Sequence, residues 1–136
     1  MIHRSKAPLR IGLAGGGTDV SPYSDQFGGA ILNATISLSA YATLQPLEEK
    51  KIIVEALDRK ESQEFELLKE LPINGELDLL KAVYNRIQKD HKFPDTGFRL
   101  STFVDAPAGS GLGTSSTLVV AILGAFVEML KLPLRD

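Results

Sequence analysis

A chain of 136 residues, 43% hydrophobic and 24% charged, has the composition of one ordinary globular domain. Its net charge of −2 gives no basic field for nucleic acid or an anionic membrane, and the absence of cysteine excludes disulfides, thiolate metal sites and a cysteine nucleophile. No apolar run approaches the ~20 residues that a membrane span needs, so we expect a cytoplasmic protein that binds neither nucleic acid nor membranes.

The first half of the chain predicts strands around a glycine loop. Apolar and polar side chains alternate with a period of two through residues 36–45, which is typical of a strand with one buried face. In chain order we expect a strand at residues 2–13, a glycine loop at 14–19, a short helix or turn at 20–27, a long strand opened by Gly28 and Gly29, and shorter strands at 52–57 and 64–68, joined by a charged turn at 58–62.

The second half adds two helices. Apolar residues recur three and four positions apart from Leu77 to Ile87, which predicts a helix with one apolar stripe. A strand at 98–104 and a second glycine loop at 105–113 follow. Residues 114–131 predict a helix that is apolar almost all round, so we expect it to be sandwiched. Pro133 ends this helix, and Asp136 is placed as the N-cap of another.

The second glycine loop has the features of an anion site. Gly109, Gly111 and Gly113 remove side chains where a backbone approaches a ligand. Three hydroxyls follow at the helix start, where free N–H groups and the helix dipole favour phosphate. A Walker A loop is excluded because the chain contains no Gly-Lys pair. On these residues alone, a flexible turn with serine caps remains the alternative.

The order of residues in this loop is more specific than its composition. Pro107-x-x-x-Gly-Leu-Gly-Thr-Ser-Ser116 resembles the second motif of the GHMP kinases, with Thr114 in place of the usual first serine. The resemblance implies that the loop wraps the phosphates of ATP and that the Ser115 hydroxyl joins the shell of a Mg²⁺ ion. The residues it assigns to ATP are Pro107, Gly109, Ser110, Gly111, Leu112, Gly113, Thr114, Ser115 and Ser116.

The first glycine loop resembles the first motif of the same family. Alone, residues 7–19 would describe a strand that leaves through a glycine turn, with Arg10 as a solvated charge. The resemblance implies that Arg10 is catalytic and faces the transferred phosphoryl group, where a cation stabilises the charge on its oxygens. It also implies that Asp19 accepts hydrogen bonds from sugar hydroxyls.

The residues beside Asp19 bear on the choice of acceptor. Gly16, Gly17 and Thr18 are the other expected substrate-binding residues. The two glycines replace the Glu-His pair of galactokinases, which counts against galactose. Instead, the sequence from Gly15 to Tyr23 resembles the first motif of those family members that phosphorylate the anomeric hydroxyl of heptose 7-phosphates.

The resemblance therefore implies an α+β fold like domain 2 of ribosomal protein S5, with a mixed or antiparallel sheet and helices packed on it. The implied function is that of a sugar kinase that uses ATP and Mg²⁺. Three alternatives stay open: a kinase for another sugar such as fucose, a non-catalytic nucleotide or sugar sensor, and an inactive gene fragment.

The general base is not among the residues that the motifs assign. In the family it is an aspartate after the second motif, where this chain offers only Glu128 and Asp136. Asp105 is expected to end a strand or cap a turn. We therefore expect residues 1–136 to be an ATP-binding N-terminal domain, truncated before the base and a C-terminal domain, inactive alone and prone to self-association through uncovered apolar surface.

Overall fold

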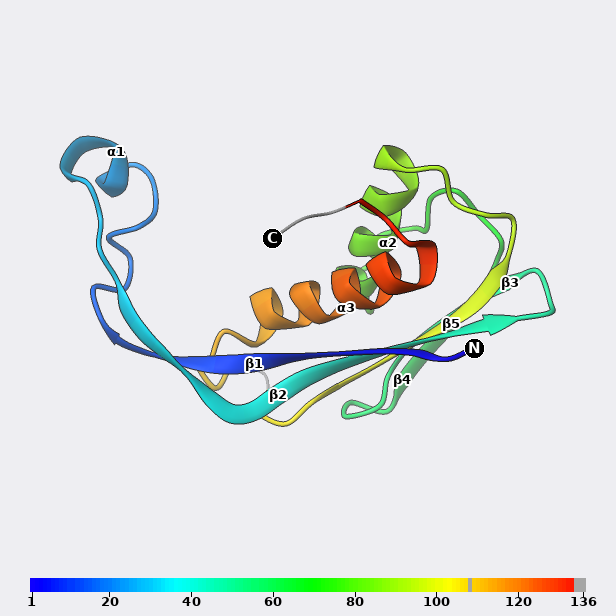
Figure 1. The fold of residues 1–136 in the computed structure, drawn as a ribbon, viewed down its shortest axis with the longest axis horizontal. Helices are drawn as coiled ribbons and strands as arrows, with labels where there is room; N and C mark the ends of the chain where they lie inside the picture. The colour runs from blue at the N-terminus through cyan, green and yellow to red at the C-terminus, as the bar shows by residue number, and fades with distance from the viewer. Residues whose placement is uncertain (108, 134–136) are drawn as a thin grey trace.

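The computed structural model describes residues 1–107 and 109–133 and shows an α+β fold, in which two helices cover one face of a five-stranded sheet (Figure 1). The strands are β1 (His3–Ala14), β2 (Leu32–Leu47), β3 (Lys51–Ala56), β4 (Glu61–Glu66) and β5 (Gly97–Val104), and the helices are α1 (Tyr23–Phe27), α2 (Asp78–Asp90) and α3 (Thr114–Leu130). The strand order is β1-β2-β5-β3-β4, antiparallel except for the parallel β3–β5 pair. The predicted mixed sheet with helices on it is confirmed.

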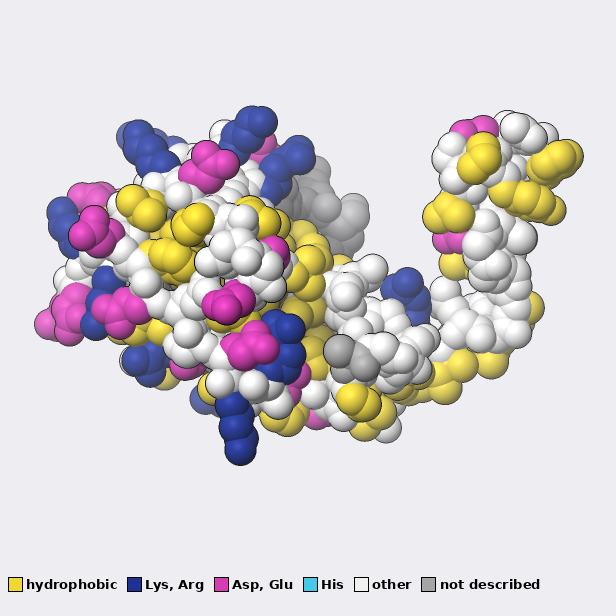
Figure 2. Space-filling model, turned by 180° about the vertical axis from the view of Figure 1, so that it is seen from behind, with side chains coloured by type: hydrophobic (Ala, Val, Ile, Leu, Met, Phe, Trp, Pro, Cys, Tyr) yellow, Lys and Arg dark blue, Asp and Glu magenta, His cyan; other side chains and the backbone are white. Residues whose placement is uncertain are grey.

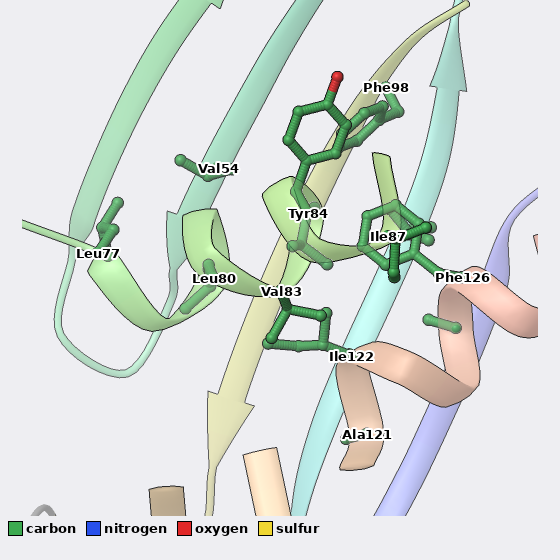
Figure 3. Packing of buried hydrophobic residues seen from close by; sticks show 14 of the residues in the cluster. Val54, Leu77, Leu80, Val83, Tyr84, Ile87, Phe98, Ala121, Ile122 and Phe126 are labelled. Carbon is green, nitrogen blue, oxygen red and sulfur yellow. The ribbon is translucent and has the colours of Figure 1, made fainter. Parts of the chain in front are cut away.

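The hydrophobic core lies between the sheet and the helices α2 and α3 (Figure 3). The alternation in β2 is confirmed where the helices cover it, because Ala40, Ala42 and Leu44 are fully buried. Buried side chains of α2 and α3 meet them from the other side: Leu80, Val83, Tyr84, Ile87, Ala121, Ile122, Ala125 and Phe126. This packing holds both helices, since neither has a side-chain hydrogen bond at its N-cap.

Two expectations need correction. The hairpin turn is shorter than predicted, so β4 begins at Glu61 and ends at Glu66. The expectation that α3 is covered on all sides is wrong for the part of the chain that the structure describes. One side of α3 packs on the sheet and on α2, whereas Val120 on the other side is 58% exposed. The expected N-cap Asp136 lies outside the described residues. None of the described helices is both long and apolar enough to cross a membrane.

Beyond the helices, β1 and β2 continue as an arm, defined here as residues 11–34. Figures 1 and 2 show this arm curving away from the body, with the short helix α1 at its tip. No residue from 11 to 34 is buried. Its apolar side chains are largely exposed, with Phe27 at 71%, Leu13 at 61% and Leu32 at 60%. The arm is therefore held by strand pairing and loop contacts and has no core of its own.

Candidate functional site

The N-terminus of α3 emerges from the second glycine loop without a cap. Gly113, the N-cap residue, has φ 71° and ψ 33° in the left-handed region and offers no side chain to the helix. The first N–H groups of a helix have no acceptors within it, and here no side chain caps them. Ser115 and Ser116 are exposed at the same place. This helix start therefore presents N–H groups, hydroxyls and the positive end of a dipole toward solvent.

Asp105 fastens the beginning of this loop to the sheet. Its backbone N–H donates to the Ser39 carbonyl at 3.0 Å. Its carboxylate accepts the Ser39 N–H at 2.9 Å and the Tyr41 hydroxyl at 3.3 Å. The carboxylate is thus engaged at the end of β5, which agrees with the expectation that Asp105 ends a strand.

Arg10 joins the two glycine-rich segments. Its backbone N–H donates to the Leu112 carbonyl at 3.1 Å, at an irregularity in the pairing of β1 with β2. A Cβ placed on Gly113 would lie 3.2 Å from the Arg10 Cζ atom, so the guanidinium rests on the backbone directly before α3. The structure therefore brings the predicted catalytic arginine against the predicted ATP loop.

A cavity of about 300 Å³ lies beside the N-terminus of α3. Thr114 and Ser115 form part of its lining. The remaining walls come from the β3–β4 turn, the start of α2, the end of β5 and α3: Ala56, Asp58, Arg59, Gly75, Leu77, Asp78, Leu79, Leu80, Thr102, Val104, Ala106 and Leu118. This volume is at the lower end of the usual range for small-molecule sites.

Residues 56–59 and 75–80 contribute walls of the cavity that were not predicted from the sequence. No motif marks these positions, and apolar periodicity predicted only that Leu77 and Leu80 would be buried. Leu77 also has φ 53°, in the left-handed region where leucine is rarely found. Nothing in the local sequence signals that conformation, because glycine or asparagine would be its usual marker.

The first glycine loop is closed by close backbone contact and by Thr18. A Cβ on Gly15 would lie 2.0 Å from the Ala30 carbonyl oxygen, and one on Gly29 would lie 2.0 Å from the Thr18 carbonyl oxygen. The single O–H of Thr18 lies within hydrogen-bond distance of the carbonyls of Gly15 (2.7 Å) and Ala30 (3.0 Å), and the Thr18 oxygen accepts the Ala30 N–H at 3.2 Å. Thr18 therefore locks the loop against the segment that leads into β2.

Asp19 and its glycine neighbours lie on the exposed arm. A Cβ on Gly16 or on Gly17 would meet no atom within 4 Å, so the space beside the loop is open. Among the described residues, no hydrogen bond or ion pair joins the Asp19 carboxylate to another side chain. In the part of the chain that the structure describes, no hydrogen bond or ion pair joins Asp19 to Arg10 or α3, so the predicted residues form two groups, one on the body and one on the arm.

Among the described residues, the acidic residue after the second motif does not approach this site. Glu128 is exposed near the far end of α3 from the glycine loop. The described residues contain no group of three His, Cys, Asp or Glu side chains that would hold a metal ion. A cation at the start of α3 would therefore depend on a hydroxyl such as that of Ser115 and on oxygens of a ligand.

In comparison with known proteins, this chain is similar to small-molecule kinases. Residues 78–136 match the model of the GHMP kinases N terminal domain. The chain is 50% identical over 133 residues to the D-glycero-alpha-D-manno-heptose 7-phosphate kinase of Campylobacter jejuni, covering 98% of this chain and 39% of that protein. It is 32% identical to the L-fucokinase/L-fucose-1-P guanylyltransferase of Bacteroides fragilis, over 88% of this chain and 15% of that protein.

A solved structure of a heptose phosphate kinase is also similar to this chain. The crystal structure of a D-glycero-D-manno-heptose 1-phosphate kinase from Bacteroides thetaiotaomicron matches with a TM-score of 0.92 and 54% identity, over 98% of this chain and 44% of that one. The chain thus spans about two fifths of the length of these heptose kinases.

Proposed function

We propose that the chain is the N-terminal domain of a GHMP kinase, and that the protein transfers the γ-phosphoryl group of ATP to the anomeric hydroxyl of a heptose 7-phosphate; the family match over residues 78–136 and the similarity to heptose kinases support this. The observation that carries the proposal is the contact between Arg10 and Gly113 at the uncapped start of α3. It sets a fixed cation beside free N–H groups, as transfer of a phosphoryl group requires.

The phosphates of ATP would bind along the second glycine loop. The backbone N–H groups at the start of α3, together with the hydroxyls of Thr114, Ser115 and Ser116, would donate to phosphate oxygens. Arg10 would face the γ-phosphoryl group and neutralise charge that spreads over its oxygens during transfer. Because Asp105 and Arg10 fasten the loop to the sheet, these donors need little rearrangement when ATP binds.

The base and ribose of ATP would occupy the cavity beside the same helix start. Apolar lining from Leu77, Leu80 and Leu118 suits a planar base, and Asp58 or Asp78 can accept from ribose hydroxyls. Since Thr114 and Ser115 belong to both the cavity and the phosphate site, one nucleotide can reach both.

Magnesium fits this arrangement as a partner of the nucleotide. The ion prefers oxygen ligands and keeps several waters, with one or two protein oxygens and the substrate phosphates. The exposed Ser115 hydroxyl at the helix start is a suitable single protein ligand. When bound, the ion would supply positive charge on the β- and γ-phosphates.

The acceptor sugar would bind on the arm, with its hydroxyls on Asp19. The open space beside Gly16 and Gly17 can admit a sugar longer than a hexose, and the backbone there adds N–H groups for polar contacts. The names of the similar proteins support a heptose phosphate, although one names the 7-phosphate and the other the 1-phosphate. The similarity to a fucokinase keeps fucose as a second candidate acceptor.

Because residues 1–136 are expected to be inactive alone, the test is an ADP-release assay on the purified complete protein with ATP and Mg²⁺, offering heptose 7-phosphate, fucose and galactose in parallel. We expect turnover with the heptose 7-phosphate, and a ³¹P NMR spectrum of the product should show a new anomeric phosphate. A preference for fucose would show that the proposed acceptor is wrong and would leave the proposed kinase activity in place. ATP binding without turnover on any sugar would indicate a sensor and overturn the proposal.

A further inference from the structure

A lysine is fully buried in α2, next to the cavity. Lys81 has 0% exposure, although lysine is rarely buried unless its charge is paired. Its Nζ atom donates to the Asn74 Oδ1 at 2.7 Å and to the Gln63 Oε1 at 3.2 Å, and it forms an ion pair with the Asp78 Oδ1 at 3.4 Å. An ammonium group has three donors, so these three acceptors satisfy it completely.

The acceptors of Lys81 all hold one short segment, residues 74–78, which we call the 74–78 turn. The Asp78 carboxylate accepts the backbone N–H groups of Asn74 and Gly75, and the Asn74 side chain accepts the N–H of Glu76. Gln63 on β4 donates to the Glu76 carboxylate at 2.6 Å. Lys81 is therefore the buried centre that ties this turn to β4 and α2.

The 74–78 turn forms a wall of the cavity at the start of α3. Gly75, Leu77 and Asp78 line that cavity together with Thr114 and Ser115. Leu77 keeps its left-handed backbone conformation only while its surroundings hold it. An apolar side chain at position 81 would fill the same space without the free-energy cost of burying a charge. The buried lysine and its acceptors therefore serve to fix one conformation of the 74–78 turn, not to add stability.

We propose that Lys81 is a positioning residue for the nucleotide, which it does not touch. By holding the 74–78 turn, it sets the wall that receives the base and ribose, while the phosphate site at the start of α3 is held separately by Asp105 and Arg10. The inference rests on the proposed use of ATP and adds a residue to which neither glycine motif points.

The two halves of the nucleotide site can be tested with two probes. ATP reaches both the cavity and the helix start, whereas inorganic tripolyphosphate occupies only the helix start. In isothermal titration calorimetry, Lys81→Met should raise the Kd for ATP by about tenfold or more, because the wall that receives the base and ribose is no longer held in place. The Kd for tripolyphosphate should stay within about twofold, a difference of less than 0.5 kcal/mol.

Two further variants make the result specific. Asn74→Ala removes the closest acceptor from an exposed position and should shift ATP binding in the same direction, which covers the case in which Lys81→Met fails to fold. Lys89→Met changes an exposed lysine on the same helix and should leave both constants unchanged.

The outcomes separate this inference from the proposed function. Equal affinity for ATP in the wild type, Lys81→Met and Asn74→Ala would overturn the positioning role of Lys81 and would leave the proposed kinase function unaffected. Parallel weakening of ATP and tripolyphosphate would also overturn it, because it indicates general damage. Failure of the wild type to bind ATP would remove both proposals.

Discussion

The two glycine-rich segments of this protein are held in place by different means. The second lies on the body, where Asp105 bonds to β2, Arg10 bonds to Leu112, and α3 has fully buried residues such as Ile122. The first lies on the arm, where no residue is buried and Thr18 closes the loop. Regions with few buried contacts open at low free energy. The proposed phosphate half of the site is thus held by the core, and the proposed acceptor half depends on local contacts.

Arg10 directly precedes the arm and contacts the loop before α3, so its replacement should have the largest effect on kcat. Its side chain is exposed, and its bond to Leu112 uses the backbone, so Arg10→Met should fold normally. We expect kcat to fall by about 10³-fold, as for cations that face a transferred phosphoryl group. Steady-state kinetics and thermal unfolding measure the two effects.

Arg4→Met, on the same strand and also exposed, is the matched control and should keep wild-type kcat. An Arg10→Met enzyme within about tenfold of wild type in kcat, a difference of about 1.4 kcal/mol in the barrier, would remove Arg10 from the transfer step.

Asp19 tests the assignment of the arm to the acceptor. Asp19→Ala should raise KM for the sugar phosphate by well over tenfold, because two or three charge-assisted hydrogen bonds of ~1.5–3 kcal/mol each would be lost. KM for ATP should stay unchanged, since Asp19 does not contact the loop before α3. Asp25→Ala, another exposed carboxylate on the arm, provides the control. A rise in KM for ATP with Asp19→Ala would contradict the division of the site.

Ser115 tests the body half in the same way. Ser115→Ala removes one proposed oxygen ligand of Mg²⁺, and we expect kcat to fall by about tenfold, equivalent to ~1.4 kcal/mol. The Mg²⁺ concentration for half-maximal rate should rise, and the affinity for the acceptor should change little. The exposed Ser62 on β4 gives the control variant. An unchanged Mg²⁺ titration would show that Ser115 is not a metal ligand.

The smallest expected effect concerns stability alone. The Tyr84 hydroxyl donates to the Leu68 carbonyl at 2.6 Å, so Tyr84→Phe should lower the free energy of unfolding by about 1 kcal/mol without changing kcat. Burial raises the pKa of Tyr84 above its ordinary value of 10.0. The difference between wild type and variant should be constant below that value, where the phenol is neutral in both states, and should shrink as pH rises through the raised pKa. Urea denaturation of both proteins at pH values below and above 10 measures this difference in the free energy of unfolding.

The structure places both glycine segments in loops, as predicted, because positive φ angles and close backbone contacts restrict these positions to glycine. The walls of the cavity could not be found in this way. Residues 56–59 and 75–80 meet only through the pairing of β3 with β4 and the packing of α2, and their types are common in any turn or helix. Lys81 is the clearest case, since a lysine beside an apolar stripe suggests an exposed side chain. Its burial depends on three acceptors distributed over β4 and residues 74–78.

The most direct test of the divided site is hydrogen–deuterium exchange followed by mass spectrometry, with ATP and the heptose 7-phosphate added separately. ATP with Mg²⁺ should protect amides at residues 109–118 and 74–78 and leave residues 14–31 unchanged. The heptose 7-phosphate should protect residues 14–31, which exchange fastest in the free protein because the arm has no buried residue. Protection of the arm by ATP alone, or of the start of α3 by the sugar phosphate alone, would contradict the account.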